Sequence, residues 1–279
     1  MKDYIVPSVT RNFTKGETII SPLTQIELEN YAHKMLSDYD AKTPGRIFKD
    51  KIRISNEDAR RLQAAVTDLR QRRGEEVIGY KIGCVAKETQ DKMGFTKPAW
   101  GRLWKSELHS DGVLLKKVNY ANPAMEAEFG IILNRDIEPG LVSFDYILNS
   151  IETIHPLIEI HNLIFHGNSP LGAELLANNA IHAGVVLGQP TNGQIVSQAT
   201  DLKLIFDNEV IETWSEKMWP YDMLSEVEWL VKELQKLGHT LRKGNLILTG
   251  AYGLPIPIND TVLIEAKSSA FGNISAIFD

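Results

Sequence analysis

The sequence predicts an α+β protein in which a helical N-terminal region precedes a strand-rich body. Apolar residues recur with helical spacing before Gly74, whereas short β-like runs separated by Gly, Pro and Asn follow it. Helices and strands do not alternate regularly, which argues against a doubly wound parallel sheet. We therefore expect an N-terminal arm (residues 1–22) and helical region within residues 1–74, and a β-rich domain over residues 75–279.

Two helices are expected in the N-terminal region. The first begins at Thr24, which has capping-box spacing to Glu27, and ends at Thr43-Pro44-Gly45. The second begins at Ser55 and ends at Gly74. Its outer face carries the arginines Arg60, Arg61, Arg70, Arg72 and Arg73. Because the chain is acidic overall, we interpret them as a solvated face rather than a nucleic-acid patch.

The body is expected to contain short strands and two helices. The strands are predicted at Val77–Ile82, Val113–Lys116, Glu126–Leu133, Leu157–His161, Ala183–Leu187, Leu202–Phe206, Leu246–Thr249, Val262–Glu265 and Ile274–Phe278. One helix is predicted near Phe144–Ile151. A stronger apolar stripe predicts another over Asp222–Leu237, with Gly238 as its stop.

The composition excludes several classes of protein. The chain has 279 residues and one cysteine, Cys84, which argues against a disulfide scaffold and a cysteine-based zinc finger. With 30 basic against 36 acidic residues, it is poorly suited to coat nucleic acid or an anionic membrane. No apolar run approaches a membrane span, and the first residues are too polar for a signal peptide. We expect a globular cytoplasmic protein.

Two glutamates on one strand are the first candidate for chemistry. Glu126 and Glu128 lie two positions apart, so their side chains are expected on the same face, about 6.5–7 Å apart along the strand. Beside a buried run they repel each other and lose hydration, and a divalent cation resolves both problems. The alternative is an exposed sheet face carrying two ordinary carboxylates.

A third glutamate, Glu159, interrupts the apolar segment His155–His161 and there needs a cation or a buried donor. Three carboxylates without cysteine form an oxygen-rich set that suits Mg²⁺ or Mn²⁺. The alternative for Glu159 is an ion pair with an arginine. The histidines His155, His161, His166 and His182 cluster in the sequence, but their spacing matches no helical zinc motif, so each is interpreted as structural.

Lys81 is the only charge in the glycine-flanked run Ile78–Cys84. A partly buried lysine with a lowered pKa acts as an acid or a base, or it holds an anionic substrate. The alternative is a strand lysine whose ammonium group reaches solvent. Cys84 has no evident histidine partner and is interpreted as a packed thiol.

Taken together, these segments carry a family resemblance. The matching pieces are Val77–Gly83, Met93–Phe95, Pro98–Leu103, Met125–Phe129, Pro156–Ile160, Asn178–Ala180, Val185–Gly188, Leu241–Gly250 and Phe271–Ile274. In this order, and over about residues 28–279, the chain resembles the 2-keto-4-pentenoate hydratase/4-oxalocrotonate decarboxylase branch of the fumarylacetoacetate hydrolase superfamily.

The resemblance implies a mixed β-roll body of the fumarylacetoacetate hydrolase type, which makes residues 75–279 the catalytic domain. It also implies a Mg²⁺ or Mn²⁺ ion and a catalytic lysine, Lys81. The implied metal ligands are Glu126, Glu128 and Glu159, and the implied substrate contacts are Asn179, His182 and Thr249. The substrates of this branch are 2-oxo or 2-hydroxydienoic acids from aromatic ring cleavage.

The sequence also departs from the branch. Where its hydratases usually read Asp-Asn-Ala-Ser-Ser, this chain has Ile181 and His182 in place of the serines. The segments Leu163–Gly167 and Thr213–Pro220 are also unlike the usual pattern, and the second of them is bulky and lacks glycine. We therefore expect an intact metal site and a remodelled pocket wall around His182 and Trp219.

The leading functional hypothesis is a metal-dependent hydratase of a 2-hydroxydienoate-like acid. The nearest rival is decarboxylation of an oxalocrotonate-like diacid, and a third reading is carbon–carbon hydrolysis of an acylpyruvate. A hypothesis from another class of function is that the chain is a non-catalytic subunit that stabilises a catalytic relative. A homo-oligomer is expected, and association with a related pathway enzyme is considered.

Overall fold

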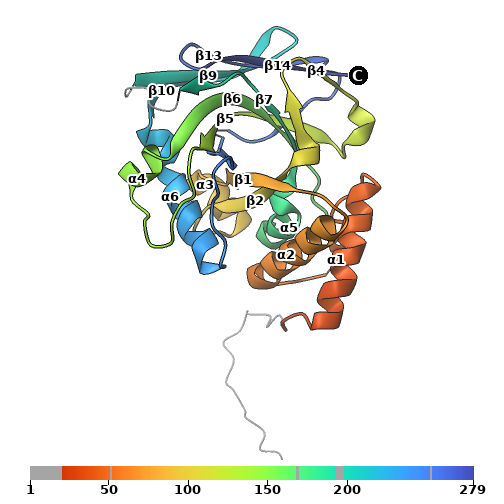
Figure 1. Cartoon of the computed structure of the whole chain (residues 1–279). Coiled ribbons are helices and arrows are strands. Elements are labelled where there is room, and N and C mark those ends of the chain that lie inside the picture. The colour runs from red at the N-terminus through yellow and green to blue at the C-terminus, as the bar shows by residue number, and fades with distance from the viewer. Residues whose placement is uncertain (1–20, 51, 168–169, 193–197, 252) are drawn as a thin grey trace, which may run out of the picture.

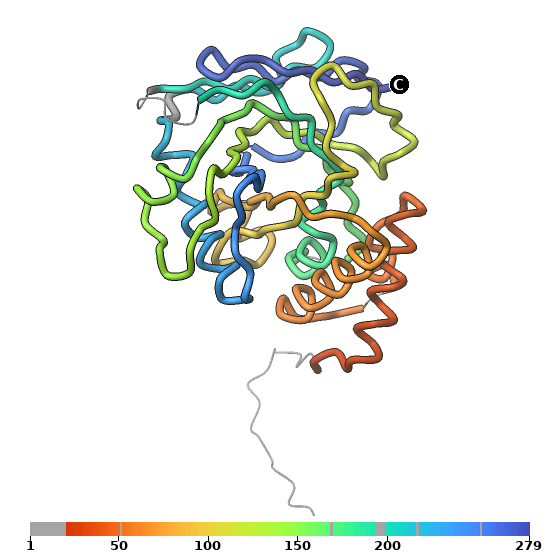
Figure 2. Tube along the Cα trace, viewed as in Figure 1, coloured from red at the N-terminus to blue at the C-terminus, as the bar shows by residue number. Residues whose placement is uncertain are grey.

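The strands of the body stack into two sheets. The computed structural model describes residues 21–50, 52–167, 170–192, 198–251 and 253–279. In Figure 1 a five-stranded sheet lies over the strongly curved strands of a nine-stranded sheet, and α1, α2 and α5 gather on the opposite side. The trace in Figure 2 follows the same path. Most of the predicted N-terminal arm lies outside the described residues. None of the described helices is long and apolar enough to cross a membrane.

The two predicted N-terminal helices are confirmed. α1 (Gln25–Asp40) carries the predicted capping box between Thr24 and Glu27. α2 (Asn56–Arg72) is capped by Ser55, whose hydroxyl accepts from the backbone N–H of Asp58, and the chain turns at Gly74 with a positive φ of 94°. Both helices share an apolar core with α5 (Gly172–Ala177), a helix of the body that was not predicted. The division into two domains at residue 74 stays a prediction.

One part of the arginine interpretation is wrong. Arg70 is buried, not solvated, with 6% of its surface exposed. Its guanidinium pairs with Glu75 and Glu107 and lies 4.0 Å above the ring of Trp104. The helical spacing could not reveal these partners, because all three follow the helix in sequence and approach it only in the folded chain.

The nine-stranded sheet positions the site. In the described part of the chain its order is β2 (Ala99–Trp104), β1 (Val77–Gly83), β11 (Leu246–Leu248), β5 (Pro123–Leu133), β6 (Ile151–Asn162), β7 (His182–Leu187) and β3 (Leu108–Ser110), with β12 (Ile256–Pro257) on β5 and β8 (Thr191–Asn192) on β6. β1 runs parallel to β11, and the approach is so close that a Cβ at Gly79 would lie 1.8 Å from the carbonyl oxygen of Leu246. Glycine at this position is therefore a steric requirement.

The five-stranded sheet covers the main apolar core. Its order is β10 (Glu209–Trp219), β9 (Gln198–Phe206), β13 (Leu263–Ser268), β14 (Gly272–Phe278) and β4 (Val113–Leu115). The remaining α-helices are α3 (Lys87–Met93), α4 (Phe144–Leu148) and α6 (Tyr221–Lys236), and the short 3₁₀ turns are Arg46–Phe48, Lys105–Glu107, Lys117–Asn119 and Asn179–Ile181.

All nine predicted strands are confirmed, but some are longer than predicted: β6 begins at Ile151 rather than Leu157, and β9 at Gln198 rather than Leu202. The expectation for Trp219 is wrong: it ends β10 with no exposed surface, and its ring packs 5.9 Å from that of Phe271. Trp219 therefore belongs to the core between the sheets rather than to a pocket wall. The segment Thr213–Pro220 looked unlike a glycine-rich loop because most of it is a strand.

Candidate active site

The register of β5 and β6 brings the acidic residues together. The two strands are antiparallel, and Glu126 lies directly opposite Glu159. Alternate residues of a strand share a face, so His161 emerges beside Glu159, and its own partner across the ladder is the small Ala124. Two adjacent strands thus deliver two carboxylates and an imidazole to one spot.

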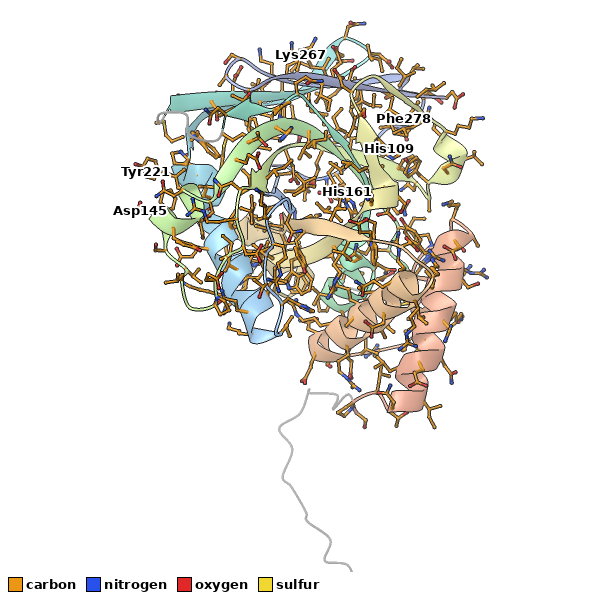
Figure 3. The ribbon with its side chains drawn as sticks, in the orientation of Figure 1. His109, Asp145, His161, Tyr221, Lys267 and Phe278 are labelled. Atoms are coloured by element: carbon orange, nitrogen blue, oxygen red, sulfur yellow. The ribbon has the colours of Figure 1, made fainter. Side chains whose placement is uncertain are left out.

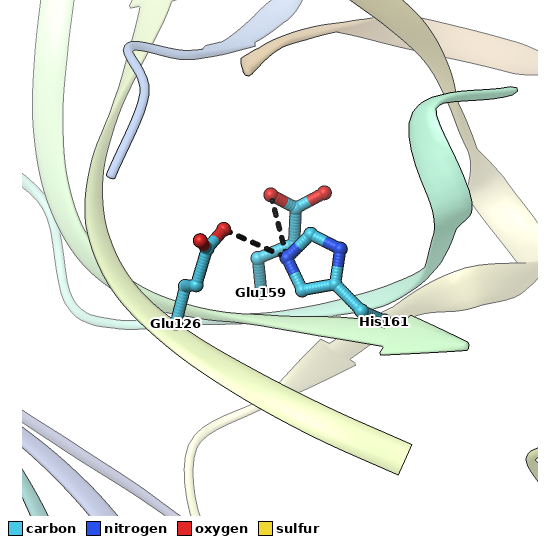
Figure 4. A group of neighbouring side chains, drawn as sticks. All are labelled: Glu126, Glu159 and His161. Carbon is cyan, nitrogen blue, oxygen red and sulfur yellow. Dashed lines mark hydrogen bonds and ion pairs between the residues drawn. The ribbon is translucent and has the colours of Figure 1, made fainter. Parts of the chain in front are cut away.

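These three side chains form a compact buried cluster (Figure 4). His161 Nε2 lies 2.8 Å from Glu126 Oε2 and 3.4 Å from Glu159 Oε2. One ligand atom from each residue lies within 4.8 Å of the other two. Figure 3 shows His161 in the interior of the molecule, and its ring is 1% exposed. The arrangement has the donor types and spacing of a metal site.

Glu159 is held from both sides of its carboxylate. His182 Nδ1 lies 2.8 Å from Oε1, and Lys81 Nζ lies 3.1 Å from Oε2. Burial opposes ionisation, but the nearby His161, Lys81 and His182 lower the pKa of Glu159 overall. Glu159 is therefore a carboxylate although its side chain has no exposed surface.

Lys81 is a fully enclosed ammonium group. Burial alone would lower its pKa, but the charges of Glu159, Glu126 and Glu128 outweigh burial and raise it. The lowered pKa considered from the sequence is therefore not what this surrounding produces. A Cβ at Gly83 would lie 3.2 Å from Lys81 Nζ, so this glycine keeps the space around the amine open.

Glu128 lies beside the cluster rather than in it. Its Oε2 accepts from the backbone N–H of Gly250 at 3.2 Å, while its buried Oε1 has no hydrogen-bond partner among the described residues. Burial, then the charges of Glu159 and Glu126, raise its pKa well above the ordinary value. The residues fit a divalent cation, because such an ion would compensate this excess of buried negative charge. The role of Glu128 as a ligand stays a prediction.

The histidines divide into two groups. His161 and His182 converge on Glu159. In contrast, His155 Nδ1 lies 2.8 Å from the carbonyl oxygen of Gly188, and His166 Nε2 lies 3.3 Å from the carbonyl oxygen of Pro44. The place of His161 in the cluster was not predicted. The available signal was its position two residues from Glu159 on the same strand, which puts both on one face.

The remaining predicted site residues point elsewhere. The amide of Asn179 is bound at both ends to the backbone of Arg102, at 2.7 and 2.8 Å. Thr249 donates its hydroxyl to the carbonyl oxygen of Phe129. Their roles as substrate contacts stay predictions. Burial raises the pKa of the Cys84 thiol to about 11, which agrees with the packed thiol expected there.

A cavity of about 260 Å³ opens onto the cluster. Lys81, Glu126 and His161 line one part of it, and the wall also contains Leu163, Phe165 and Leu254. Part of the unusual segment Leu163–Gly167 therefore does line a pocket, as expected. His182 lies outside this cavity and lines a smaller one of about 40 Å³.

The turn Asn179–Ile181 separates the two cavities. Ile181 lines both of them, and Ala180 lines the larger one. All three residues have positive φ, from 53° to 56°, in the left-handed region that non-glycine residues rarely adopt. Lys81 Nζ lies 3.5 Å from the carbonyl oxygen of Ala180, so this turn also supplies an acceptor to the site.

Comparison with known proteins shows which enzymes the chain resembles. No family model matches the sequence. The chain is 26% identical over 263 residues to 2-keto-4-pentenoate hydratase of Paraburkholderia xenovorans, covering 92% of this chain and 97% of the relative. A hydratase of the same name from Burkholderia vietnamiensis is 27% identical, with 78% and 84% covered. The chain is thus similar to these hydratases over most of its length. The predicted resemblance to this branch of the fumarylacetoacetate hydrolase superfamily is confirmed.

The fold matches those of a solved decarboxylase and a solved hydrolase. 4-Oxalocrotonate decarboxylase from Pseudomonas putida G7, solved with magnesium and adipate, superposes with a TM-score of 0.81 at 19% identity, covering 92% of this chain and 99% of that one. Fumarylpyruvate hydrolase from Pseudomonas aeruginosa, solved with Mn²⁺ and pyruvate, gives 0.54 at 13% identity, with 71% and 88% covered. The predicted fold class is confirmed.

Proposed function

We propose that this protein is a divalent-metal-dependent lyase that adds water to a 2-hydroxydienoate or 2-oxo-enoate acid. The main support is the cluster of Glu126, Glu159 and His161. It lies beside Lys81 and lines part of a cavity that also has apolar walls. The curated relatives named hydratases support the reaction type.

Glu126 and Glu159 would hold the ion, Mg²⁺ or Mn²⁺, with Glu128 close enough to share in compensating its charge. When bound, the ion supplies Lewis acidity that stabilises negative charge on the oxygens of a 2-oxo acid. Every other step falls to the residues of this chain, which bind the substrate, exclude water and move protons.

Lys81 is the residue placed to handle a proton. Hydration of a dienoate requires a proton at a substrate carbon, C3 or C5, and an ammonium group with a raised pKa is a proton donor. The same charge also pairs with a substrate carboxylate. Its contacts with Glu159 and the carbonyl oxygen of Ala180 hold the amine at the edge of the cavity.

The cavity favours the hydratase over decarboxylation of a diacid. Among its described lining residues, the basic side chains are Lys81 and His161, both at the cluster. A second carboxylate at the far end of the substrate would therefore lack a basic partner among these residues, which costs free energy where the group loses its water. A relative from Escherichia coli, 25% identical, is named 2-oxo-hept-4-ene-1,7-dioate hydratase, so hydration of a diacid is a further competing reaction.

Product masses test the proposal directly. Purified protein with Mg²⁺ or Mn²⁺ is incubated with a 2-hydroxydienoate and an oxalocrotonate-type diacid together, with a chelator-treated sample as control. We expect the dienoate to gain one water only when metal is present. Loss of carbon dioxide from the diacid would instead establish the decarboxylase. No change in either would remove both activities and leave hydrolysis of an acylpyruvate, tested with that substrate, or a non-catalytic subunit, tested by co-purification with a catalytic relative.

We also propose that the protein forms a homo-oligomer, associates with a related pathway enzyme and is located in the cytoplasm. The supporting observation is indirect, because the relatives are metabolic enzymes with small-molecule substrates. Sedimentation of the purified protein at several concentrations measures the oligomeric state, and a monomer at all concentrations would contradict the first of these.

A further inference from the structure

His161 has a position that an ordinary buried histidine does not need. It lies opposite Ala124, whose small side chain leaves space across the ladder, and its ring reaches toward Glu126. The same nitrogen, Nε2, faces oxygens of two different carboxylates, at 2.8 Å for Glu126 and 3.4 Å for Glu159. One N–H group serves one of these oxygens well, so hydrogen bonding alone leaves the second contact unexplained.

The spacing of these atoms matches ligands around one ion. With metal–ligand bonds of about 2.1 Å, neighbouring ligands of an octahedral site lie about 3.0 Å apart. The two distances from His161 Nε2 lie on either side of this value. Glu159 Oε2 is buried and lies 3.1 Å from Lys81 Nζ. A carboxylate oxygen has more than one lone pair, so this oxygen can bind an ion as well as face the amine.

The surroundings also orient Glu159 for this role. His182 Nδ1 lies 2.8 Å from Glu159 Oε1 and leaves Oε2 to face the cluster. Such contacts on the far side of a ligand fix its direction and raise metal affinity. The other ring nitrogen of His161, Nδ1, is buried without a partner among the described residues, so the contacts of the ring lie on its Nε2 side.

We propose that His161 is a metal ligand of this site and that it makes the site prefer a transition-metal ion such as Co²⁺, Fe²⁺ or Mn²⁺ over Mg²⁺. The reason is chemical: imidazole nitrogen binds first-row transition metals well, whereas Mg²⁺ prefers oxygen donors. The inference rests on the proposed function and refines it, because it adds a nitrogen donor to the carboxylates that the family resemblance implies.

Metal binding without substrate is the test. Calorimetry measures the affinities of the metal-free protein for Co²⁺ and for Mg²⁺ in the wild type, His161→Leu and His161→Gln. We expect His161→Leu to weaken Co²⁺ binding by at least about tenfold and Mg²⁺ binding by much less, since one ligand is lost. His161→Gln offers an oxygen donor and should lower the ratio of Co²⁺ to Mg²⁺ affinity. The matched control is His155→Gln on the same strand, which should leave both affinities unchanged.

A measurement on the wild type keeps the inference testable if the variants do not fold. Pulsed electron paramagnetic resonance of the Mn²⁺-loaded protein should show coupling to a directly bound histidine nitrogen, and ¹⁵N-labelled histidine should change it. Ion binding without this coupling, or equal losses of Co²⁺ and Mg²⁺ affinity in His161→Leu, would overturn the role of His161 and leave the hydratase proposal standing. A wild type that binds none of these ions would overturn both.

Discussion

Two regions of this protein bury charge in opposite ways. Around Arg70, the cation pairs with Glu75 and Glu107, and Glu107 also accepts from the hydroxyl of Tyr39 at 2.8 Å. The other oxygen of Glu107 has no hydrogen-bond partner among the described residues and lies 3.8 Å from His182 Nε2, so the two regions adjoin. In the cluster on β5 and β6, three glutamates face one lysine and two histidines, and burial and the charges of Glu159 and Glu126 raise the pKa of Glu128. The first region resembles a structural ion pair, and the second resembles a site that awaits another cation.

Structural and functional buried charges differ in how they are compensated. A buried ion pair is stable when each charge finds a partner within the chain, as at Arg70. Uncompensated buried carboxylates cost free energy, and a protein tolerates this where the site gains a ligand or a reaction from it. Substitutions in the cluster should therefore change metal binding and turnover, whereas substitution of Arg70 should change stability.

The largest effect is expected from Glu159→Gln. The variant keeps the size of the side chain but removes the charge opposite Glu126, so metal binding should be lost and kcat should fall by at least about 10²–10³-fold. Steady-state kinetics and metal titration check this. Glu152→Gln makes the same change at an exposed position of the same strand and should act as wild type. Near-normal activity of Glu159→Gln would place the chemistry elsewhere.

Lys81→Met should separate proton transfer from metal binding. We expect kcat to fall by about 10²–10⁴-fold because the buried ammonium is lost, while the metal affinity stays measurable. The control is Lys105→Met, which removes an exposed lysine paired with Glu76. Full turnover by the metal-loaded Lys81→Met protein would remove Lys81 from the mechanism.

Arg70→Met should reduce stability rather than chemistry. The change leaves Glu75 and Glu107 without their buried partner, so the free energy of unfolding should fall by about 3–5 kcal/mol. Urea denaturation measures it, and kcat of the folded fraction should stay near wild type. Arg73→Met, on the more exposed pair with Asp40, should cost about 1 kcal/mol or less. Equal losses of unfolding free energy in Arg70→Met and Arg73→Met would contradict a structural role for the buried Arg70 pair.

Glu128→Gln should have the smallest effect in the metal-free protein. Because the folded-state pKa of Glu128 is raised, the unfolded chain ionises first, and stability should fall as the pH rises above about 4.3. The glutamine cannot ionise, so its metal-free stability should depend less on pH, and thermal denaturation across this range shows the difference. An unchanged pH dependence would mean that Glu128 is ionised in the folded chain.

Much of the fold could be predicted because its signals are local. Thr24 and Ser55 cap helices through contacts three residues away, and the alternation within β5 is visible in the sequence. Strand β10 was missed because its residues do not alternate regularly and the bulky segment near Trp219 was interpreted as a pocket wall. Burial of Arg70 was missed because its partners come from other elements.

The site was predicted in part for the same reason. Glu126 and Glu159 stand out as charges in apolar runs, and that signal needs no partner strand. His161 lies two residues from Glu159, which predicts a shared face, but its closeness to Glu126 depends on the pairing of β5 with β6, and that pairing was not predicted. Because each histidine was interpreted as structural, the place of His161 beside both glutamates was missed.

The left-handed turn Asn179–Ile181 has a consequence for the evolution of stability. Non-glycine residues in this region cost about 1–3 kcal/mol each, and here three occur in succession. Glycine at Ala180 would relieve part of this cost, yet it would also loosen the carbonyl group that faces Lys81. Selection for a more heat-resistant protein and selection for a well-placed amine therefore pull this position in opposite directions.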